Sequence, residues 1–422
     1  MERYSSYKTT SIQWLKEIPS HWECVRIKNI LKESQQTTID GKEEQLSVTQ
    51  SFGIIRSIDA KISNPPSSTL GWKIVKRNDI VFNKYKAHSG VFFASQYDGI
   101  VTFNYSVYNC FNNCNPKYYE LLFHTDSCIG EFRKLMRGVG ESISPLYTAQ
   151  LYTVRIPLPP LDEQEKIVSY LEDKTSKIDA YVADKEKEIE LLQELKQKTI
   201  ADAVTKGLNP DAKMKDYSSL ISSSCPEHWK IVRNKSFLSL TGEKVGKKAS
   251  EFVLLSLTTK GVIVRDIESG KGKFPKDFDT YQIVKPNELV FCLFDIDETP
   301  RTVGLVETEG MLTGAYTAFK VHTELANPEY IYNYYLCVDN IKALKPYYSG
   351  LRKTVRADKF QQIYMPLPPL NEQQAIVAYI EEKCQKIDKL TSELQSEIDY
   401  LKEYKQRLIA DVVTGQVNVQ NL

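Results

Sequence analysis

The stretch PLPPLDEQEKIVSYLEDKTSKIDA (residues 157–180) returns later in the chain as PLPPLNEQQAIVAYIEEKCQKIDK (residues 366–389). The two copies lie about 209 residues apart, and about 15 of their 24 aligned positions are identical. A long repeat at a fixed offset is typical of an internal duplication. We therefore expect the chain to build one structural plan twice.

Each copy predicts a rigid lead-in followed by a long helix. The proline pairs at 159–160 and 368–369 cannot lie inside a helix and hold the preceding residue extended, so the helix must begin after them. Asp162 and Glu165 have the N-cap and N3 spacing of a capping box, and the second copy has Asn and Gln at the matching positions. A helix start at about residue 162 is therefore predicted.

The predicted helices are long and amphipathic. No Pro or Gly interrupts them before Gly207 and Gly415, and roughly 44 residues at about 1.5 Å each make a rod of about 65 Å. Apolar residues recur along both rods in heptads, which predicts a coiled-coil seam. The expected seam residues are Val168, Leu171, Ile178, Val182, Ile189 and Leu192 in the first rod and Val377, Ile380, Ile387, Leu394, Ile398, Leu401 and Leu408 in the second.

Lysines interrupt the seam of the first rod. Lys185 and Lys196 fall on seam positions, and Lys405 recurs in the second rod at the register of Lys196. Their stems can extend out of a short seam, or their ammonium groups can meet a partner protein. Chain order favours antiparallel pairing of the rods, because parallel pairing would require a connection back along their whole length.

The remaining sequence forms two lobes that share a scaffold. P-x-H-W occurs at the start of each, with Trp22 and Trp229, and a buried tryptophan is favoured over a binding surface. Strand and turn signals recur in the same order in both lobes, and NPKYY (residues 115–119) and NPEYI (residues 327–331) open helices predicted to run to about Met136 and Tyr347. The lobes are thus mixed α and β domains.

Charge and composition limit the class of protein. The lobes carry about +5 and +3 and the rods about −4 and −3, although the whole chain of 422 residues is nearly neutral at +1. Basic lobes are a modest signal for polyanion binding. The eight scattered cysteines are expected to be reduced structural thiols, and no apolar run predicts a membrane span or signal peptide, so a cytoplasmic protein is expected.

Two segments of the shared scaffold differ between the lobes. In the alignment of the two copies, residues 83–95 (NKYKAHSGVFFAS) correspond to 292–306 (CLFDIDETPRTVGLV). The segment RGVGESISP from Arg137 corresponds to SGLRKTVRADKF from Ser349. A common scaffold with unlike loops indicates two modules that recognise different things. The carboxylates Asp295, Asp297 and Glu298 are interpreted as a solvated loop rather than a metal site. The five histidines form no catalytic pattern, so no catalytic residues and no metal site are predicted.

The paired P-x-HW, PLPPL-x-EQ and KQ-x-x-IADxVT motifs closely resemble the specificity subunit of type I restriction-modification systems, the HsdS family. The resemblance covers essentially the whole chain. It implies an α+β fold with two pseudo-twofold-related target-recognition domains, separated by a long antiparallel two-helix coiled coil. The implied domains are 1–156 (first target recognition domain), 157–207 (first spacer helix), 208–225 (linker), 226–364 (second target recognition domain), 365–416 (second spacer helix) and 417–422 (tail).

The resemblance also implies function. Each lobe would read one half of a bipartite asymmetric site in double-stranded DNA, while the helices set the spacing and dock two modification subunits, with restriction subunits in the full complex. The chain itself would be no enzyme and hold no cofactor, with S-adenosylmethionine in the modification subunit and ATP and Mg in the restriction subunit. The alternative is a non-catalytic coiled-coil scaffold, or an orphan DNA-binding protein without a methyltransferase partner.

Candidate DNA contacts are cations and polar groups on the divergent segments, because such groups suit phosphate anchoring and base reading. They are Asn83, Lys84, Lys86, His88 and Arg137 in the first lobe and Arg301, Arg352, Lys353 and Arg356 in the second.

Overall fold

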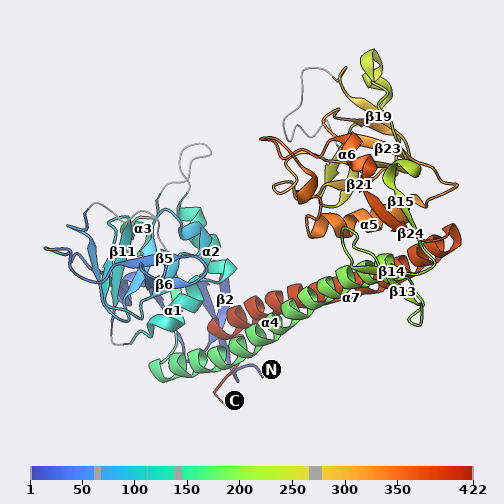
Figure 1. Cartoon of the computed structure of the whole chain (residues 1–422). Coiled ribbons are helices and arrows are strands. Elements are labelled where there is room, and N and C mark those ends of the chain that lie inside the picture. The colour runs from blue at the N-terminus through green and yellow to red at the C-terminus, as the bar shows by residue number, and fades with distance from the viewer. Residues whose placement is uncertain (1, 61–67, 112, 137–144, 266–277, 421–422) are drawn as a thin grey trace. The chain divides into compact units, whose positions relative to one another are not determined.

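Contacts divide the chain into two compact units (Figure 1). The first holds Met1–Glu186 and Ser396–Leu422, and the second holds Lys187–Gln395. Both divisions fall inside the long helices α4 (Leu161–Lys206) and α7 (Leu370–Val413), so each unit contains part of both helices. The computed structural model describes residues 2–60, 68–111, 113–136, 145–265 and 278–420.

The first unit is a mixed domain around a four-stranded antiparallel sheet in the order β4-β11-β8-β9. Its other strands pair in twos: β1 with β2, β3 with β12, β5 with β6 and β7 with β10. The elements are β1 (Tyr7–Ile12), β2 (Leu15–Pro19), β3 (Glu23–Arg26), β4 (Leu31–Glu33), β5 (Leu46–Thr49), β6 (Gly53–Arg56), β7 (Lys73–Val75), β8 (Ile80–Asn83), β9 (Phe92–Ala94), β10 (Gly99–Val101), β11 (Tyr105–Cys110), α1 (Pro116–Phe123), α2 (Asp126–Leu135), α3 (Thr148–Leu151) and β12 (Arg155–Leu158).

The second unit repeats this topology. Its four-stranded sheet has the order β16-β23-β20-β21, and its pairs are β13 with β14, β15 with β24, β17 with β18 and β19 with β22. The elements are β13 (Met214–Asp216), β14 (Ser224–Pro226), β15 (Lys230–Arg233), β16 (Leu238–Leu240), β17 (Leu255–Thr258), β18 (Gly261–Val264), β19 (Gln282–Val284), β20 (Glu288–Phe291), β21 (Val303–Leu305), β22 (Gly310–Leu312), β23 (Thr317–Val321), α5 (Pro328–Asn340), α6 (Ala357–Gln362) and β24 (Tyr364–Leu367).

The helices after the NP motifs are shorter than predicted. Asn115 and Asn327 cap them and proline occupies the first turn, as expected. In the first unit, however, Thr125 ends one helix and caps the next: its hydroxyl donates to the Leu122 carbonyl at 2.7 Å and accepts from the Cys128 N–H. A threonine that bonds the backbone locally favours a cap over a helix interior, and the predicted single helix is therefore two.

The long helices begin earlier than predicted. The N–H groups of Glu163 and Gln164 both donate to the Pro160 carbonyl at 3.0 Å, so the helix starts at Leu161 and Asp162 lies in its first turn instead of at the cap. The predicted stops are confirmed, because Gly207 and Gly415 follow the two helices with positive φ angles of 73° and 75°. Only glycine adopts that conformation without strain.

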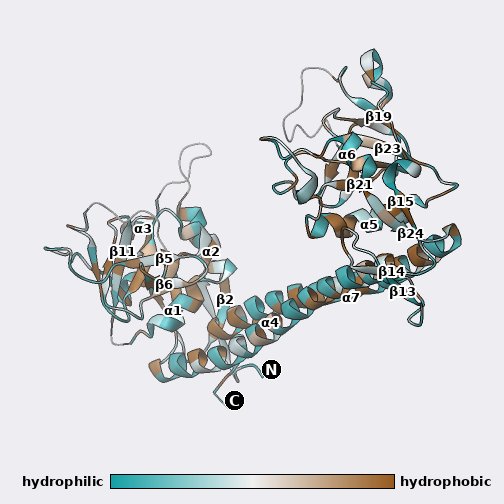
Figure 2. Cartoon of the chain, in the orientation of Figure 1, coloured by the Kyte–Doolittle hydropathy of each residue, from teal (hydrophilic) through white to brown (hydrophobic). Residues whose placement is uncertain are grey.

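Within each unit α4 and α7 run antiparallel. In the first unit Val168 and Leu171 near the start of α4 share one core with Leu408 and Val412 near the end of α7. The second unit shows the reverse pairing, with residues 200–204 of α4 against 376–380 of α7. Figure 2 shows hydrophobic and hydrophilic residues alternating along both helices, as amphipathic helices require.

The repeated motifs meet at the start of each long helix. The Gln164 side chain accepts from the Asn115 N–H at 2.8 Å and donates to the Pro159 carbonyl at 2.8 Å. Glu163 binds His21 of P-x-H-W, with 2.8 Å between Nε2 and Oε2. Gln373 and Glu372 make the matching contacts in the second unit, to Asn327, Pro368 and His228. These motifs recur because they join one lobe to one helix start.

Both lobes also hold the far end of the other long helix. The Tyr118 hydroxyl donates to the Val413 carbonyl at 2.7 Å, and the Tyr330 hydroxyl donates to the Val204 carbonyl at 3.1 Å. The last four carbonyls of a helix have no partner within it, so these bonds satisfy groups that burial would otherwise leave unpaired. Trp22 and Trp229 are fully buried nearby, which confirms the packing interpretation of the P-x-H-W motif.

Candidate DNA-recognition surfaces

The described parts of the two segments that differ between the lobes lie close together in each unit. In the first unit the N–H of Leu146, the residue directly after the second segment, donates to the Lys84 carbonyl at 2.8 Å. In the second, the Asp295 N–H donates to the Arg352 carbonyl at 2.9 Å and the Val355 N–H to the Leu293 carbonyl at 2.7 Å. The unlike segments therefore meet in the second unit, and in the first unit the chain directly after residue 145 meets the turn at Lys84.

The first surface begins where β8 ends. The Asn83 side chain accepts from the Tyr85 N–H at 3.0 Å, and the Lys86 N–H donates to the Asn83 carbonyl at 2.9 Å, which closes a tight turn. Lys84 lies over the Tyr85 ring, with Nζ 5.7 Å from its centroid. Lys86 is exposed and His88 is half-buried. The turn presents two lysines on either side of an aromatic ring.

Arg137, the remaining candidate of the first unit, lies outside the described residues. The described part of its segment resumes at Pro145 and leads into α3.

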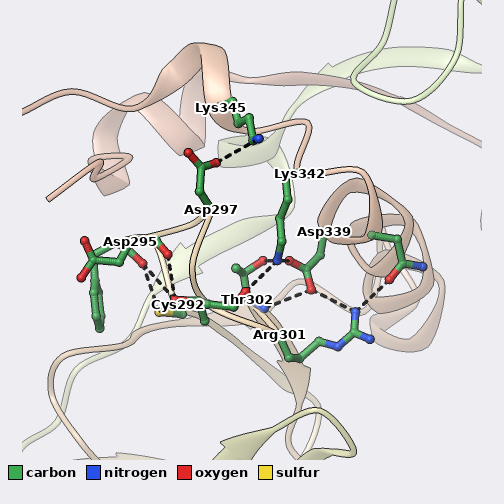
Figure 3. Close-up of polar contacts among 11 residues, drawn as sticks. Cys292, Asp295, Asp297, Arg301, Thr302, Asp339, Lys342 and Lys345 are labelled. Atoms are coloured by element: carbon green, nitrogen blue, oxygen red, sulfur yellow. Dashed lines mark hydrogen bonds and ion pairs between the residues drawn. The ribbon is translucent and has the colours of Figure 1, made fainter. Parts of the chain in front are cut away.

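In the second unit the candidate cations lie against carboxylates. Arg352, whose side chain is 77% exposed, has a guanidinium nitrogen 3.9 Å from Asp295. Lys353 Nζ lies 3.4 Å from carboxylate oxygens of both Asp297 and Glu298. Lys345 approaches Asp297 at 3.4 Å, as the dashed line in Figure 3 shows. Asp297 departs from the predicted solvated loop, because its side chain is only 21% exposed and is paired, whereas Glu298 is 75% and Asp295 37% exposed.

The pairing keeps these groups charged. Burial disfavours the ionised form of Asp297, but hydrogen bonds from Lys345 and Lys353 outweigh it, so the pKa of this carboxyl lies below its ordinary value. Hydrogen bonds to Asp297 and Glu298 raise the pKa of the Lys353 ammonium. At neutral pH the surface therefore carries cations and anions in contact, in place of a plain basic patch.

Arg301 has a different environment from the other candidates. Its side chain is only 19% exposed, and its Nη1 donates to Oδ2 of the buried Asp339 at 2.9 Å. Asp339 also accepts from the Thr302 N–H and hydroxyl, at 3.1 and 2.6 Å, and from Lys342 at 2.7 Å (Figure 3). This geometry indicates that Arg301 positions the loop and does not contact a base.

Arg356 stands at the start of the short helix α6. Its side chain is 73% exposed and its Nε lies 3.1 Å from Asp358, which is also exposed. Exposed pairs of this kind exchange partners at little cost. Arg356 is therefore accessible to a phosphate.

The predicted seam residues all lie on the inner faces of α4 and α7. Each is buried or half-buried, and none is exposed. The seam lysines are paired in matching fashion: Lys405 lies 2.6 Å from Asp179 in the first unit, and Lys196 lies 2.6 Å from Asp388 in the second. Their ammonium groups thus link the two helices, which explains why they recur at one register.

Comparison with known proteins identifies the family. The family model described as "Type I restriction modification DNA specificity domain" matches residues 19–191 and 307–400, together more than half of the chain. The chain belongs to this family. DNA target recognition is therefore its function, and the reading as a scaffold without a methyltransferase partner is not favoured. Type I specificity subunits are non-catalytic, and the catalytic activities lie in partner subunits.

Similar curated proteins span the same length. The type I restriction enzyme MjaVIII specificity subunit of Methanocaldococcus jannaschii is 24% identical over 430 residues, covering 96% of this chain and 95% of that protein. The putative MjaX specificity subunit of the same organism is also 24% identical, covering 98% of this chain and 97% of its own. These matches confirm that the paired motifs are those of a type I specificity subunit.

Solved structures share the fold. A chain from a study of complex assembly and conformational transition of the type I R-M system has a TM-score of 0.71 at 15% identity, covering 95% of this chain and 99% of that one. The HsdS subunit from Thermoanaerobacter tengcongensis has a TM-score of 0.55 at 15% identity, covering 97% of this chain and 100% of that one.

Within the described residues of this specificity-family chain, no helix is long and apolar enough to cross a membrane.

Sequence reasoning missed Asp339 and the pairing of the carboxylate loop. Asp339 is the only acidic residue of α5 after the first turn, in a helix rich in apolar and aromatic residues, and that contrast is the one signal that could have marked it. A carboxyl group on a buried helix face requires a partner. Lys342 lies only three residues later, but Arg301 and Thr302 lie 38 and 37 residues earlier in the chain, where no local pattern indicates them.

Proposed function

We propose that each unit reads one half of a split, asymmetric DNA target. The observation that carries the proposal is the placement of the divergent segments: the scaffold of the two units is the same, while backbone hydrogen bonds join described residues in or directly beside the unlike segments of each unit. Identical units would read identical half-sites, so unlike surfaces imply unlike half-sites. The exposed Lys86, Arg352 and Arg356 and the half-buried Lys84 and Lys353 are the phosphate and base contacts.

A genome-wide map of methylated adenine, with and without this gene, tests the proposal. Deletion is expected to remove one split motif made of two short, unlike halves around a fixed gap. Replacing residues 292–306 and 349–360 by those of a relative is then expected to change one half only. A motif that changes in both halves, or a palindromic motif, would count against one half-site per unit.

We further propose that the long helices bind two modification subunits, one at each unit. The supporting observation is that the same Gln–Asn and Glu–His contacts occur at the two helix starts. The acidic outer faces of the helices are the docking surface, and Glu186, Glu188 and Glu190 belong to it. Native mass spectrometry of the assembled complex gives the stoichiometry, and charge reversal at these glutamates is expected to weaken assembly.

The chain is proposed to act in the cytoplasm without a cofactor of its own. S-adenosylmethionine belongs to the modification subunit, and ATP with Mg belongs to the restriction subunit. Equilibrium dialysis of the purified chain against labelled S-adenosylmethionine and ATP is expected to give no binding. Binding that appears only after the modification subunit is added supports this assignment, and binding by the chain alone contradicts it.

A further inference from the structure

A short hairpin of the second unit presents one apolar side chain to solvent. Ser349 and Thr354 exchange two backbone hydrogen bonds, of 3.0 and 3.1 Å, and enclose the four residues Gly350 to Lys353. Leu351 stands at the tip with a relative exposure of 103%. Isolated surface leucines are common, but a leucine fixed at the tip of an anchored turn with its whole side chain in water is a different case.

The hairpin is held in place by its backbone. The Lys353 N–H donates to the Gly350 carbonyl at 3.1 Å, and the positive φ angles of Gly350 (75°) and Lys353 (44°) belong to this tight turn. The Arg352 carbonyl and the Val355 N–H bond to residues 293–295, and Val355 is buried. The tip therefore cannot fold back to bury Leu351 without losing these bonds.

Two cations follow the leucine in the hairpin and do not cover it. Arg352 lies over the Phe294 ring, with its guanidinium carbon 5.5 Å from the centroid, and next to Asp295. Lys353 is held by Asp297 and Glu298 at 3.4 Å. The Arg352–Asp295 pair is the more exposed of the two, so a DNA phosphate can replace Asp295 at little cost. An apolar group next to two cations suits the groove of a duplex, where phosphates line both edges and the bases offer apolar faces.

The first unit has a tip of the same character on its own divergent segment. Tyr85 is half-exposed between Lys84 and Lys86. The two tips share no sequence, but each places a bulky side chain next to cations, Tyr85 between two lysines and Leu351 directly before Arg352 and Lys353. The two tips therefore have the same kinds of side chain, although their sequences differ.

We infer that Leu351 is an apolar wedge that enters the DNA at a base step of the half-site read by the second unit. The inference rests on the proposed function, since it requires this surface to face DNA. Wedge insertion partly unstacks the step, and the energy of unstacking depends on the step, being low at flexible pyrimidine–purine steps. Leu351 thereby contributes to specificity without a hydrogen bond to any base.

The test uses the full chain assembled with its modification subunits and a duplex that carries the target found by methylation mapping. We expect Leu351→Ala to weaken target binding about tenfold, because most of the apolar contact is lost. Binding to an unrelated duplex is expected to stay within about twofold, since that binding is electrostatic. Leu351→Met, which keeps the bulk, is expected to restore target binding. Adenine replaced by 2-aminopurine next to the wedged step is expected to fluoresce with the native chain and not with Leu351→Ala.

A matched variant separates the possible failures. If Arg352→Gln weakens target binding and Leu351→Ala does not, the wedge is refuted while the proposed DNA surface stands. If neither variant changes binding, the surface itself is refuted at this loop. If Leu351→Ala lowers only the yield of assembled complex and leaves its DNA affinity unchanged, Leu351 contacts a protein, and the wedge is again refuted.

Discussion

Replacing Asp339 by alanine is expected to destabilise the second unit by about 3 kcal/mol. The carboxylate is 2% exposed and accepts from Arg301, Lys342 and twice from Thr302. Breaking a buried charge pair by removing one partner costs about 3–5 kcal/mol. The lower end applies because each cation keeps another acceptor: Arg301 has Asn340 at 3.1 Å, and Lys342 has the Thr299 carbonyl at 2.7 Å.

Hydrogen exchange of the core amides in β20 and β23 measures this change for the second unit by itself. A loss of about 3 kcal/mol corresponds to roughly a hundredfold faster exchange through opening. Asp358→Ala is the matched control, because it removes an aspartate from an exposed pair with Arg356, where about 0–1 kcal/mol is expected. Equal effects of the two substitutions would refute the argument that burial makes the Asp339 network important.

Three further predictions follow from single side chains. Glu298→Gln removes one of two carboxylates that hold Lys353, and binding to an unrelated duplex at low salt is expected to rise about two- to fivefold by fluorescence anisotropy. Tyr118→Phe and Tyr330→Phe each remove one bond to a helix-end carbonyl and are expected to cost about 1 kcal/mol by urea unfolding. Burial lowers the pKa of His124 below the ordinary 6.5, so the unfolded chain binds more protons, stability falls as pH drops below about 6.5, and His124→Gln is expected to flatten that slope.

Each of these has a result that contradicts it. Glu251→Gln removes an exposed carboxylate far along the chain from Glu298, and an equal rise in DNA binding would mean that net charge alone is responsible. A tyrosine variant as stable as the native chain would mean that water replaces the hydroxyl at the helix end. An unchanged pH slope in His124→Gln would assign the acid sensitivity to another group.

The scaffold was predictable because its signals are local and occur twice. The hairpin of Leu46–Thr49 with Gly53–Arg56 returns as Leu255–Thr258 with Gly261–Val264, each with alternating side chains and a glycine after the turn. Heptads located every seam residue on the inner helix faces. The prediction failed at Thr125, where the hydroxyl bonds the Leu122 carbonyl and ends the helix, and at the start of α4, where the Pro160 carbonyl accepts the first helical bonds. In both places several local hydrogen bonds of similar strength were possible.

The recognition surface was predictable in its location and not in its chemistry. Comparing the two copies singled out the divergent segments, and backbone hydrogen bonds join their described parts in the second unit. The role of each cation depended on partners distant in the chain: Asp297 lies about 48 residues before Lys345, and Arg301 about 38 before Asp339. A charge count treats Arg301 and Arg352 alike. Arg301 is half-buried against Asp339 and positions the loop, whereas Arg352 is accessible to DNA.

The composition of the two units has a consequence for biosynthesis. The second unit is one continuous stretch, Lys187–Gln395, whereas the first unit needs Ser396–Leu422 from the other end of the chain. A ribosome adds about 5–20 residues per second, so residues 1–186 wait roughly ten seconds or more for the segment that covers Val168 and Leu171. The unit whose synthesis begins first is therefore completed last. A chain that lacks residues 396–422 leaves the apolar residues Val168 and Leu171 of the first unit exposed.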